Sequence, residues 1–249
     1  MAVKISTNDA MTQGVSFPPP GLSRPWRGTV GRRLRSIYTT LFRHYGPCHW
    51  WPGESKFEIL VGVVLTQNTN WSNVEKAIAN LARAGCLDPH KLLDCPPAKL
   101  AELIRPSGYY NVKQKRLRAV VGWFVERFGG SFEAMGREGL DSLRAELLAV
   151  HGLGPESVDS ILLYVLGKPS FVIDAYTRRL LHRHGLCAER ASYDELKALF
   201  EDRLPRDAAL FNEYHALIVY AGKDYCKPTP RCAGCPLEAS GIQSRMALP

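Results

Sequence analysis

The chain has 249 residues, of which 45% are hydrophobic and 22% are charged, a balance that excludes a disordered protein. Its 32 lysines and arginines exceed its 24 aspartates and glutamates, and the resulting net charge of +8 favours a polyanionic partner such as nucleic acid. No apolar stretch is long enough for a membrane helix, and residues 1–10 lack the apolar core of a secretory signal. Seven cysteines, an odd number in a chain large enough to bury a core, indicate a reducing cytoplasm rather than a disulfide scaffold.

Residues 1–25 are predicted to form a disordered tail, because the proline-rich run at 17–25 excludes helix and sheet and the residues before it are polar. From about residue 31, apolar residues recur with the 3.6-residue period of amphipathic helices, and strict alternation is nearly absent. Short breaks rich in glycine and proline separate these segments. We therefore expect an all-α fold of eight to eleven helices.

The segment from His151 to Pro155 (His-Gly-Leu-Gly-Pro) lies between two helical patterns, at 139–149 and 155–166. Gly152 and Gly154 allow backbone angles that other residues resist, and proline suits the first position of a helix. The pattern predicts a helix-hairpin-helix motif whose unpaired N–H groups bind a backbone phosphate without sequence preference. An ordinary hairpin between two helices is the alternative.

Asp174 ends an apolar run and begins the next helical pattern. Its structural interpretation is an N-cap, which typically contributes about 1 kcal/mol. Its functional interpretation is a carboxylate at the mouth of a cleft, which stabilises an oxocarbenium-like sugar and helps to activate water. Both roles are compatible with one side chain.

In combination, these features resemble the helix-hairpin-helix DNA glycosylases of the endonuclease III type over residues 57–235. The matching segments are Leu-Thr-Gln-Asn-Thr at 65–69, Gly-Tyr-Tyr-Asn-Val-Lys at 108–113, His-Gly-Leu-Gly at 151–154, Val-Ile-Asp at 172–174, and the cysteines near the C-terminus. The resemblance implies a base-excision-repair N-glycosylase with two helical domains and a DNA-binding cleft. One domain is a six-helix barrel at 48–168, with the helix-hairpin-helix at 139–166. The other joins residues 26–47 to 169–249 and carries a cysteine loop at 226–241.

The same resemblance implies roles for individual residues. Asp174 is the expected catalytic aspartate, and Gln67 fills the gap that a flipped base leaves. The DNA-binding residues expected besides Gln67 are Gly152, Gly154, Ser157 and Lys113.

Glu156 departs from the family pattern. Bifunctional members carry a lysine at this position, whose amine attacks the sugar and permits strand cleavage. A carboxylate cannot form an imine, although an acidic residue in the first turn of a helix is favourable in any protein. We therefore expect a monofunctional enzyme, with the catalytic role of Glu156 left open. The alternatives are a bifunctional glycosylase and abasic-site lyase that acts on oxidised pyrimidines through a relocated amine, and a non-catalytic DNA-binding protein.

The cysteine loop also departs from the family, whose iron–sulfur loop has four cysteines. Cys226, Cys232 and Cys235 match the first three, but the fourth would fall at Gly241. A [4Fe-4S] cluster with a fourth ligand other than cysteine is our expectation, and zinc or no metal are the alternatives.

Three tryptophans indicate the class of base. The pattern of Trp50, Trp51 and Trp71 is similar to the 3-methyladenine glycosylase branch of the family, and aromatic faces attract a cationic alkylated purine that has left the stack. The alternatives are core tryptophans and a specificity for oxidised pyrimidines. The expected partner is damaged double-stranded DNA, bound by a monomer in the cytoplasm, and on the nucleoid if the protein is bacterial.

Overall fold

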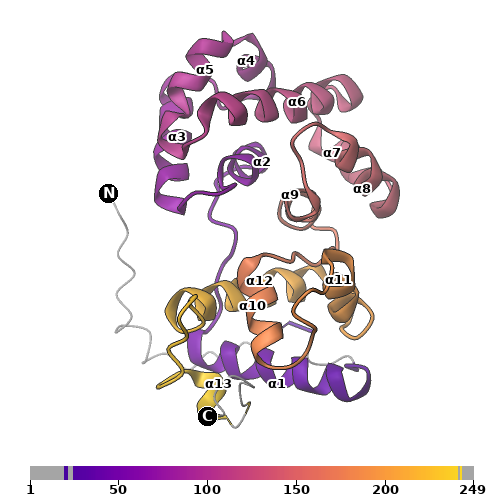
Figure 1. Cartoon of the computed structure of the whole chain (residues 1–249). Helices are drawn as coiled ribbons and strands as arrows, with labels where there is room; N and C mark the ends of the chain where they lie inside the picture. The colour runs from indigo at the N-terminus through magenta and orange to yellow at the C-terminus, as the bar shows by residue number, and fades with distance from the viewer. Residues whose placement is uncertain (1–19, 22–24, 241, 243–249) are drawn as a thin grey trace, which may run out of the picture.

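The computed structural model describes residues 20–21, 25–240 and 242, and within these residues it is helical without strands (Figure 1), which confirms the all-α prediction. The elements in chain order are α1 (Gly28–Tyr45), α2 (Lys56–Leu65), α3 (Trp71–Arg83), α4 (Pro89–Asp94), α5 (Pro97–Leu103), the 3₁₀ turn η1 (Arg105–Ser107), α6 (Tyr110–Phe128), α7 (Phe132–Arg137), α8 (Leu140–Ala149), α9 (Pro155–Ser160), the π-helical turn η2 (Ile161–Val165), α10 (Ala175–Arg183), α11 (Tyr193–Glu201), α12 (Ala208–Asp224) and α13 (Pro236–Ala239).

The thirteen α-helices of the described residues exceed the eight to eleven that we expected. The excess comes from short helices such as α4, α7 and α13, which have six, six and four residues. A segment of fewer than two turns is too short for its period to be read from the sequence. The predicted tail at 1–25 lies almost wholly outside the described residues.

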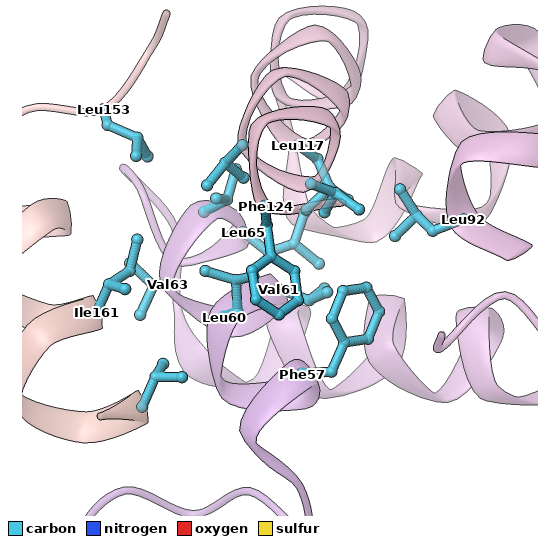
Figure 2. Packing of buried hydrophobic residues seen from close by; sticks show 14 of the residues in the cluster. Phe57, Leu60, Val61, Val63, Leu65, Leu92, Leu117, Phe124, Leu153 and Ile161 are labelled. Carbon is cyan, nitrogen blue, oxygen red and sulfur yellow. The ribbon is translucent and has the colours of Figure 1, made fainter. Parts of the chain in front are cut away.

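A first hydrophobic core forms around α2, in which seven of ten residues are buried. Figure 2 shows side chains of α2 between those of its neighbours, with Phe124 of α6 and Ile161 of η2 on different sides, and all of them belong to this core. The buried residues of this core run from Phe57 to Val165. Because α2 is apolar on every face, it can only be stable inside such a bundle.

A second core joins the two ends of the described chain. Helix α1 packs beside α12 and α13, and α10 packs on α12 (Figure 1). Phe171 stacks on Phe200 with ring centroids 3.8 Å apart, and Tyr214 contacts both rings edge-on. Apolar residues before Asp174 thereby fix the start of α10 in this core. The domain boundaries that we expect near residues 48 and 168 stay a prediction.

The helix that begins at Pro155 links the two cores. Its π-helical turn points Ile161, Leu162 and Val165 into the first core, and Leu163 and Tyr164 into the second. Residues of one helix thus serve both cores, and η2 packs on α12.

A buried ion pair supports the same junction. Asp159 is fully buried, and its carboxylate accepts hydrogen bonds from Arg144 at 3.0 Å and from the hydroxyl of Ser170 at 2.6 Å. Lys197 of α11 lies 3.9 Å away. These partners compensate the charge of Asp159 and connect the hairpin to the second core.

Within the described part of the chain, every helix is too short or too polar to span a lipid bilayer.

Candidate active site

A cleft of about 1060 Å³ lies where the two cores meet. Its walls are the loop between α2 and α3, the hairpin before α9, the start of α10 and one face of α12. The lining includes residues 66–71, 152–157 and 174–176, together with Trp50, Trp51, Arg116, His215 and Lys223. The hairpin, Asp174 and the tryptophans, which are far apart in the sequence, therefore share one space.

The hairpin has the predicted geometry at Gly152 but not at Gly154. Gly152 has a φ of +87°, and a Cβ there would lie 2.2 Å from Cγ of Arg116, so only glycine fits. Gly154 has a φ of −99°, which any residue adopts, so our expectation that it needs the conformational freedom of glycine is wrong. A Cβ on Gly154 would meet nothing within 4 Å, so this position opens onto free space in front of the first amides of α9.

Gln67 is tied to the hairpin. Its amide nitrogen donates to the carbonyl of Gly152 at 3.3 Å and to the hydroxyl of Ser157 at 3.0 Å, and its amide oxygen accepts from Arg116 at 2.6 Å. The side chain of Ser157 is therefore buried beneath Gln67. These contacts hold the loop after α2 against the hairpin at the edge of the cleft.

Asp174 is the N-cap of α10, and its Oδ1 accepts the amide of Thr177 at 2.7 Å. Its Oδ2 lies 3.6 Å from Nε2 of His215, within ion-pair distance. Burial works to raise the pKa of Asp174, but His215 and the hydrogen bond from Thr177 together outweigh it, so the pKa lies below its ordinary value. The structure thus holds a carboxylate, rather than a carboxylic acid, in the cleft.

Our sequence interpretation missed His215 and Tyr164, which lie beside Asp174. Nδ1 of His215 is 2.6 Å from the phenol oxygen of Tyr164. His215 belongs to the buried face of α12 and Tyr164 to η2, and both read as core residues in the sequence. A histidine and a tyrosine in apolar runs give no local signal of a site, because only the tertiary fold brings them to Asp174.

Glu156 also faces the cleft, in the first turn of α9. Desolvation raises the pKa of its carboxyl to about 7, with the charge of Asp174 adding to the effect and that of His215 opposing it. The site therefore holds two carboxyl groups whose proton affinities are separated, with Asp174 as the stronger acid.

The three predicted tryptophans form an aromatic wall. The Trp51 ring lies edge-on to Trp71 with centroids 5.2 Å apart and edge-on to Trp50 at 5.6 Å, and Tyr164 lies 5.1 Å from Trp51. Nζ of Lys223 is 5.8 Å from the centroid of the Trp50 ring. Part of each tryptophan also packs on the cores.

We expected Lys113 to bind DNA, but its side chain does not lie in the cleft. It is 1% exposed, and its ammonium group donates to the carbonyls of Leu65 at 2.8 Å and Ser107 at 2.7 Å. Burial lowers its pKa to about 8, with Arg116 contributing. Lys113 therefore caps the end of α2 from inside the protein, and a phosphate group cannot reach it in this conformation.

The cysteine loop does not fit a metal as it stands. Cys226, Cys232 and Cys235 are partly buried, but among the described residues no group of three or more histidine, cysteine, aspartate or glutamate side chains is arranged to hold a metal. The hydroxyl of Ser240 donates to the carbonyl of Pro236, and the fourth family position, 241, lies outside the described residues.

Arginines of α10 hold this loop instead. Arg183 donates to the sulfur of Cys226 at 3.2 Å and to the carbonyls of Lys227 and Pro228 at 2.6 Å each. Arg179 donates to the carbonyl of Cys226 at 2.5 Å. The loop is thus fixed to the helix that begins at Asp174.

Comparisons with known proteins agree with this geometry. Residues 61–206 match the HhH-GPD superfamily of base excision DNA repair proteins. A protein of Methanocaldococcus jannaschii named as a DNA repair glycosylase is 48% identical over 207 residues, which cover 82% of this chain and 94% of that protein. Endonuclease III of Thermotoga maritima is 31% identical over 180 residues, which cover 72% of this chain and 79% of that protein.

Solved structures give the same assignment. The 3-methyladenine DNA glycosylase of H. pylori, bound to 1,N6-ethenoadenine, has a TM-score of 0.65 at 34% identity, over 77% of this chain and 96% of that one. A non-covalent endonuclease III–DNA complex has a TM-score of 0.73 at 21% identity, over 88% of this chain and 96% of that one, which shows a shared fold. The chain therefore belongs to the HhH-GPD superfamily of base excision DNA repair proteins, and it is a DNA glycosylase.

Proposed function

We propose that this glycosylase hydrolyses the N-glycosidic bond of an alkylated base in duplex DNA and leaves the abasic site uncut. The bond between C1′ and the base nitrogen breaks, and the base leaves with the bonding electrons, so that a cationic alkylated purine departs as a neutral base and a neutral base gains a proton. A water oxygen then bonds to C1′ and loses a proton. The observation that carries the proposal is that Asp174, the hairpin and three tryptophans line one cleft.

Asp174 supplies the charge that this reaction needs. As the base leaves, positive charge develops on the sugar, and a desolvated carboxylate nearby stabilises it more than water does. The lowered pKa keeps Asp174 ionised near neutral pH. The same carboxylate can accept a proton from the attacking water.

The hairpin and Gln67 hold the DNA strand. The first amides of α9 lack helical partners, and the open space at Gly154 lets a backbone phosphate approach them. Gly152 shapes the turn, and Ser157 holds Gln67 in place to fill the gap of the extruded base. We expect a monomer to act on damaged double-stranded DNA in the cytoplasm, and on the nucleoid if the protein is bacterial.

The aromatic wall favours an alkylated base. Trp50, Trp51 and Trp71 offer ring faces on which an extruded base can stack, and such faces favour an electron-poor alkylated ring. The structure of the H. pylori 3-methyladenine DNA glycosylase bound to 1,N6-ethenoadenine supports this class. Oxidised pyrimidines are the alternative that relatives named endonuclease III suggest.

The expectation of hydrolysis rather than lyase chemistry rests on Glu156, and the amines near the cleft bear on the alternative. Glu156 stands at the lysine position of the bifunctional members. Lys168 donates to the carbonyls of Gly136 and Glu138 and does not line the cleft. Lys223 does line it, and this observation favours a second candidate function, in which Lys223 forms an imine and the strand is cut.

A panel of duplexes, each with one defined lesion, tests the proposal. The protein should release an alkylated base, and the strand should break only after alkali treatment. Borohydride should trap no protein–DNA adduct. A trapped adduct that the Lys223→Met variant no longer forms would establish the lyase alternative, and release of only oxidised pyrimidines would refute the proposed base class. Iron and sulfide analysis of the purified protein tests the [4Fe-4S] expectation, and zinc analysis tests its alternative.

A further inference from the structure

We propose that Tyr164 and His215 are positioning residues that direct an imidazole N–H at Oδ2 of Asp174. This inference rests on the proposed function, because it concerns the carboxylate to which that function assigns the chemistry. It adds two residues, from η2 and α12, that the sequence did not single out.

His215 is buried, and each of its two ring nitrogens faces one polar group. The residue is 5% exposed, so water is largely excluded from its ring. Its Nδ1 has one close partner, the phenol oxygen of Tyr164 at 2.6 Å. Its Nε2 is buried without a hydrogen-bond partner within the described part of the chain, and Oδ2 of Asp174 is 3.6 Å away. A buried polar atom that faces a carboxylate just beyond hydrogen-bond distance indicates an interaction that tightens with small movements.

The proton positions follow from the chemistry of the three groups. Burial raises the pKa of Tyr164 well above its ordinary value, and the charges of Asp174 and Glu156 add to this effect, so the phenol keeps its proton. When the phenol donates in this contact, Nδ1 is the acceptor nitrogen of the imidazole. The remaining proton is on Nε2, where it faces Asp174. The opposite tautomer would turn a lone pair toward the carboxylate.

The groups around Asp174 decide what this N–H does. His215 on α12 and the amide of Thr177 on α10 favour the ionised form, whereas Glu156 on α9 places a second carboxyl group nearby. Lys223 and Arg179 also line the cleft. Because His215 contributes most to the lowering, removing its N–H should raise the pKa of Asp174 and move the acidic limb of the rate profile to higher pH.

Four variants separate a positioning role from a structural one. His215→Leu removes the N–H, and His215→Gln replaces it with an amide N–H that does not titrate. Tyr164→Phe keeps the ring and removes only the hydroxyl that fixes the tautomer. Tyr38→Phe is the matched control, because Tyr38 is a buried tyrosine of the second core that does not line the cleft, and its hydroxyl has no hydrogen-bond partner among the described residues.

Carbon-13 NMR titration of Asp174 in the free protein is the primary readout, since it requires no substrate. His215→Leu should raise the pKa of Asp174 by about one pH unit or more, and Tyr164→Phe should raise it by a smaller amount. His215→Gln should restore most of the wild-type value, and Tyr38→Phe should leave it unchanged. If Tyr164→Phe behaves like Tyr38→Phe, or if both variants of His215 leave the pKa of Asp174 unchanged, the proposal is overturned.

Base release under single-turnover conditions provides the second readout. The acidic limb of the pH–rate profile should move to higher pH for His215→Leu and should lie near its wild-type position for His215→Gln. The affinity for an abasic-site analogue should be the same in both variants. Equal losses of rate in both variants without a shift of the limb would overturn the proposal. Failure of the wild type to release any base would refute the proposed function instead, and the titration of Asp174 would still decide the positioning role.

Discussion

Replacement of Glu156 by glutamine should change the pH dependence of stability. An unfolded glutamate loses its proton near pH 4.5, whereas the folded chain holds that of Glu156 up to about pH 7. Between these pH values the folded state binds more protons than the unfolded state, so its free energy of unfolding falls as pH rises. Glutamine cannot ionise, so the Glu156→Gln variant avoids this loss.

The magnitude follows from the pKa and the exposure of the side chain. A pKa that rises from 4.5 to about 7 would correspond to about 3 kcal/mol for a fully shielded group. Although its carboxyl is partly desolvated, Glu156 as a whole is exposed to the water of the cleft, which screens its charge, so we expect about 1 kcal/mol. Relative to the wild type, Glu156→Gln should therefore gain about 1 kcal/mol in free energy of unfolding between pH 5 and pH 8.

Urea denaturation at several pH values from 5 to 9 measures this gain. Glu195→Gln is the control, because hydrogen bonds from Ser192 lower the pKa of Glu195, and its contribution is lost only as pH falls below about 4.5. The difference in free energy of unfolding between Glu195→Gln and the wild type should stay constant from pH 5 to pH 8. The reasoning would be refuted if the difference in free energy of unfolding between Glu156→Gln and the wild type were also constant over this range. It would equally be refuted if Glu156→Gln became less stable relative to the wild type as the pH rises to 8.

Three further predictions concern the elements that hold the cleft. Gly152→Ala should lose about 1–3 kcal/mol in urea unfolding, because of its positive φ and the contact with Arg116, whereas Gly154→Ala should unfold like the wild type but bind DNA more weakly. Asp159→Ala should lose about 3–5 kcal/mol in the same assay, since it leaves the charge of Arg144 without its buried partner, and a loss under 1 kcal/mol would contradict the ion-pair account. Lys113→Met should lose about 1–3 kcal/mol by leaving two buried carbonyls without donors. A smaller salt dependence of DNA binding in this variant would show that Lys113 contacts phosphate after all.

The parts of the site that the sequence predicts are those with local signals. The hairpin is encoded by two glycines and a proline between helical periods, and α8 and α9 begin at or within one residue of the predicted positions. Asp174 follows a buried apolar run and precedes a helix, which is the local pattern of an N-cap. Each of these features depends on neighbours within a few residues, which is why a sequence can specify them.

The parts that it could not predict depend on contacts between distant segments. His215 and Asp174 are on different helices, and the apolar residues around His215 are typical of a core. Lys113 sits in a basic run that reads as a solvent-exposed face, but the end of α2 draws its ammonium group inside. Gly154 is a reasonable candidate for a strained backbone from the sequence, and only its φ of −99° in the folded chain shows that it is not.

The central claim, that an ionised Asp174 removes the base, is tested most directly by Asp174→Asn. Asparagine caps a helix about as well as aspartate, so the free energy of unfolding should change little. With a duplex that carries an alkylated base, we expect single-turnover base release to fall roughly a hundredfold or more. Affinity for an abasic-site analogue should stay within a few fold of the wild type. Base release at the wild-type rate by this variant would contradict the account.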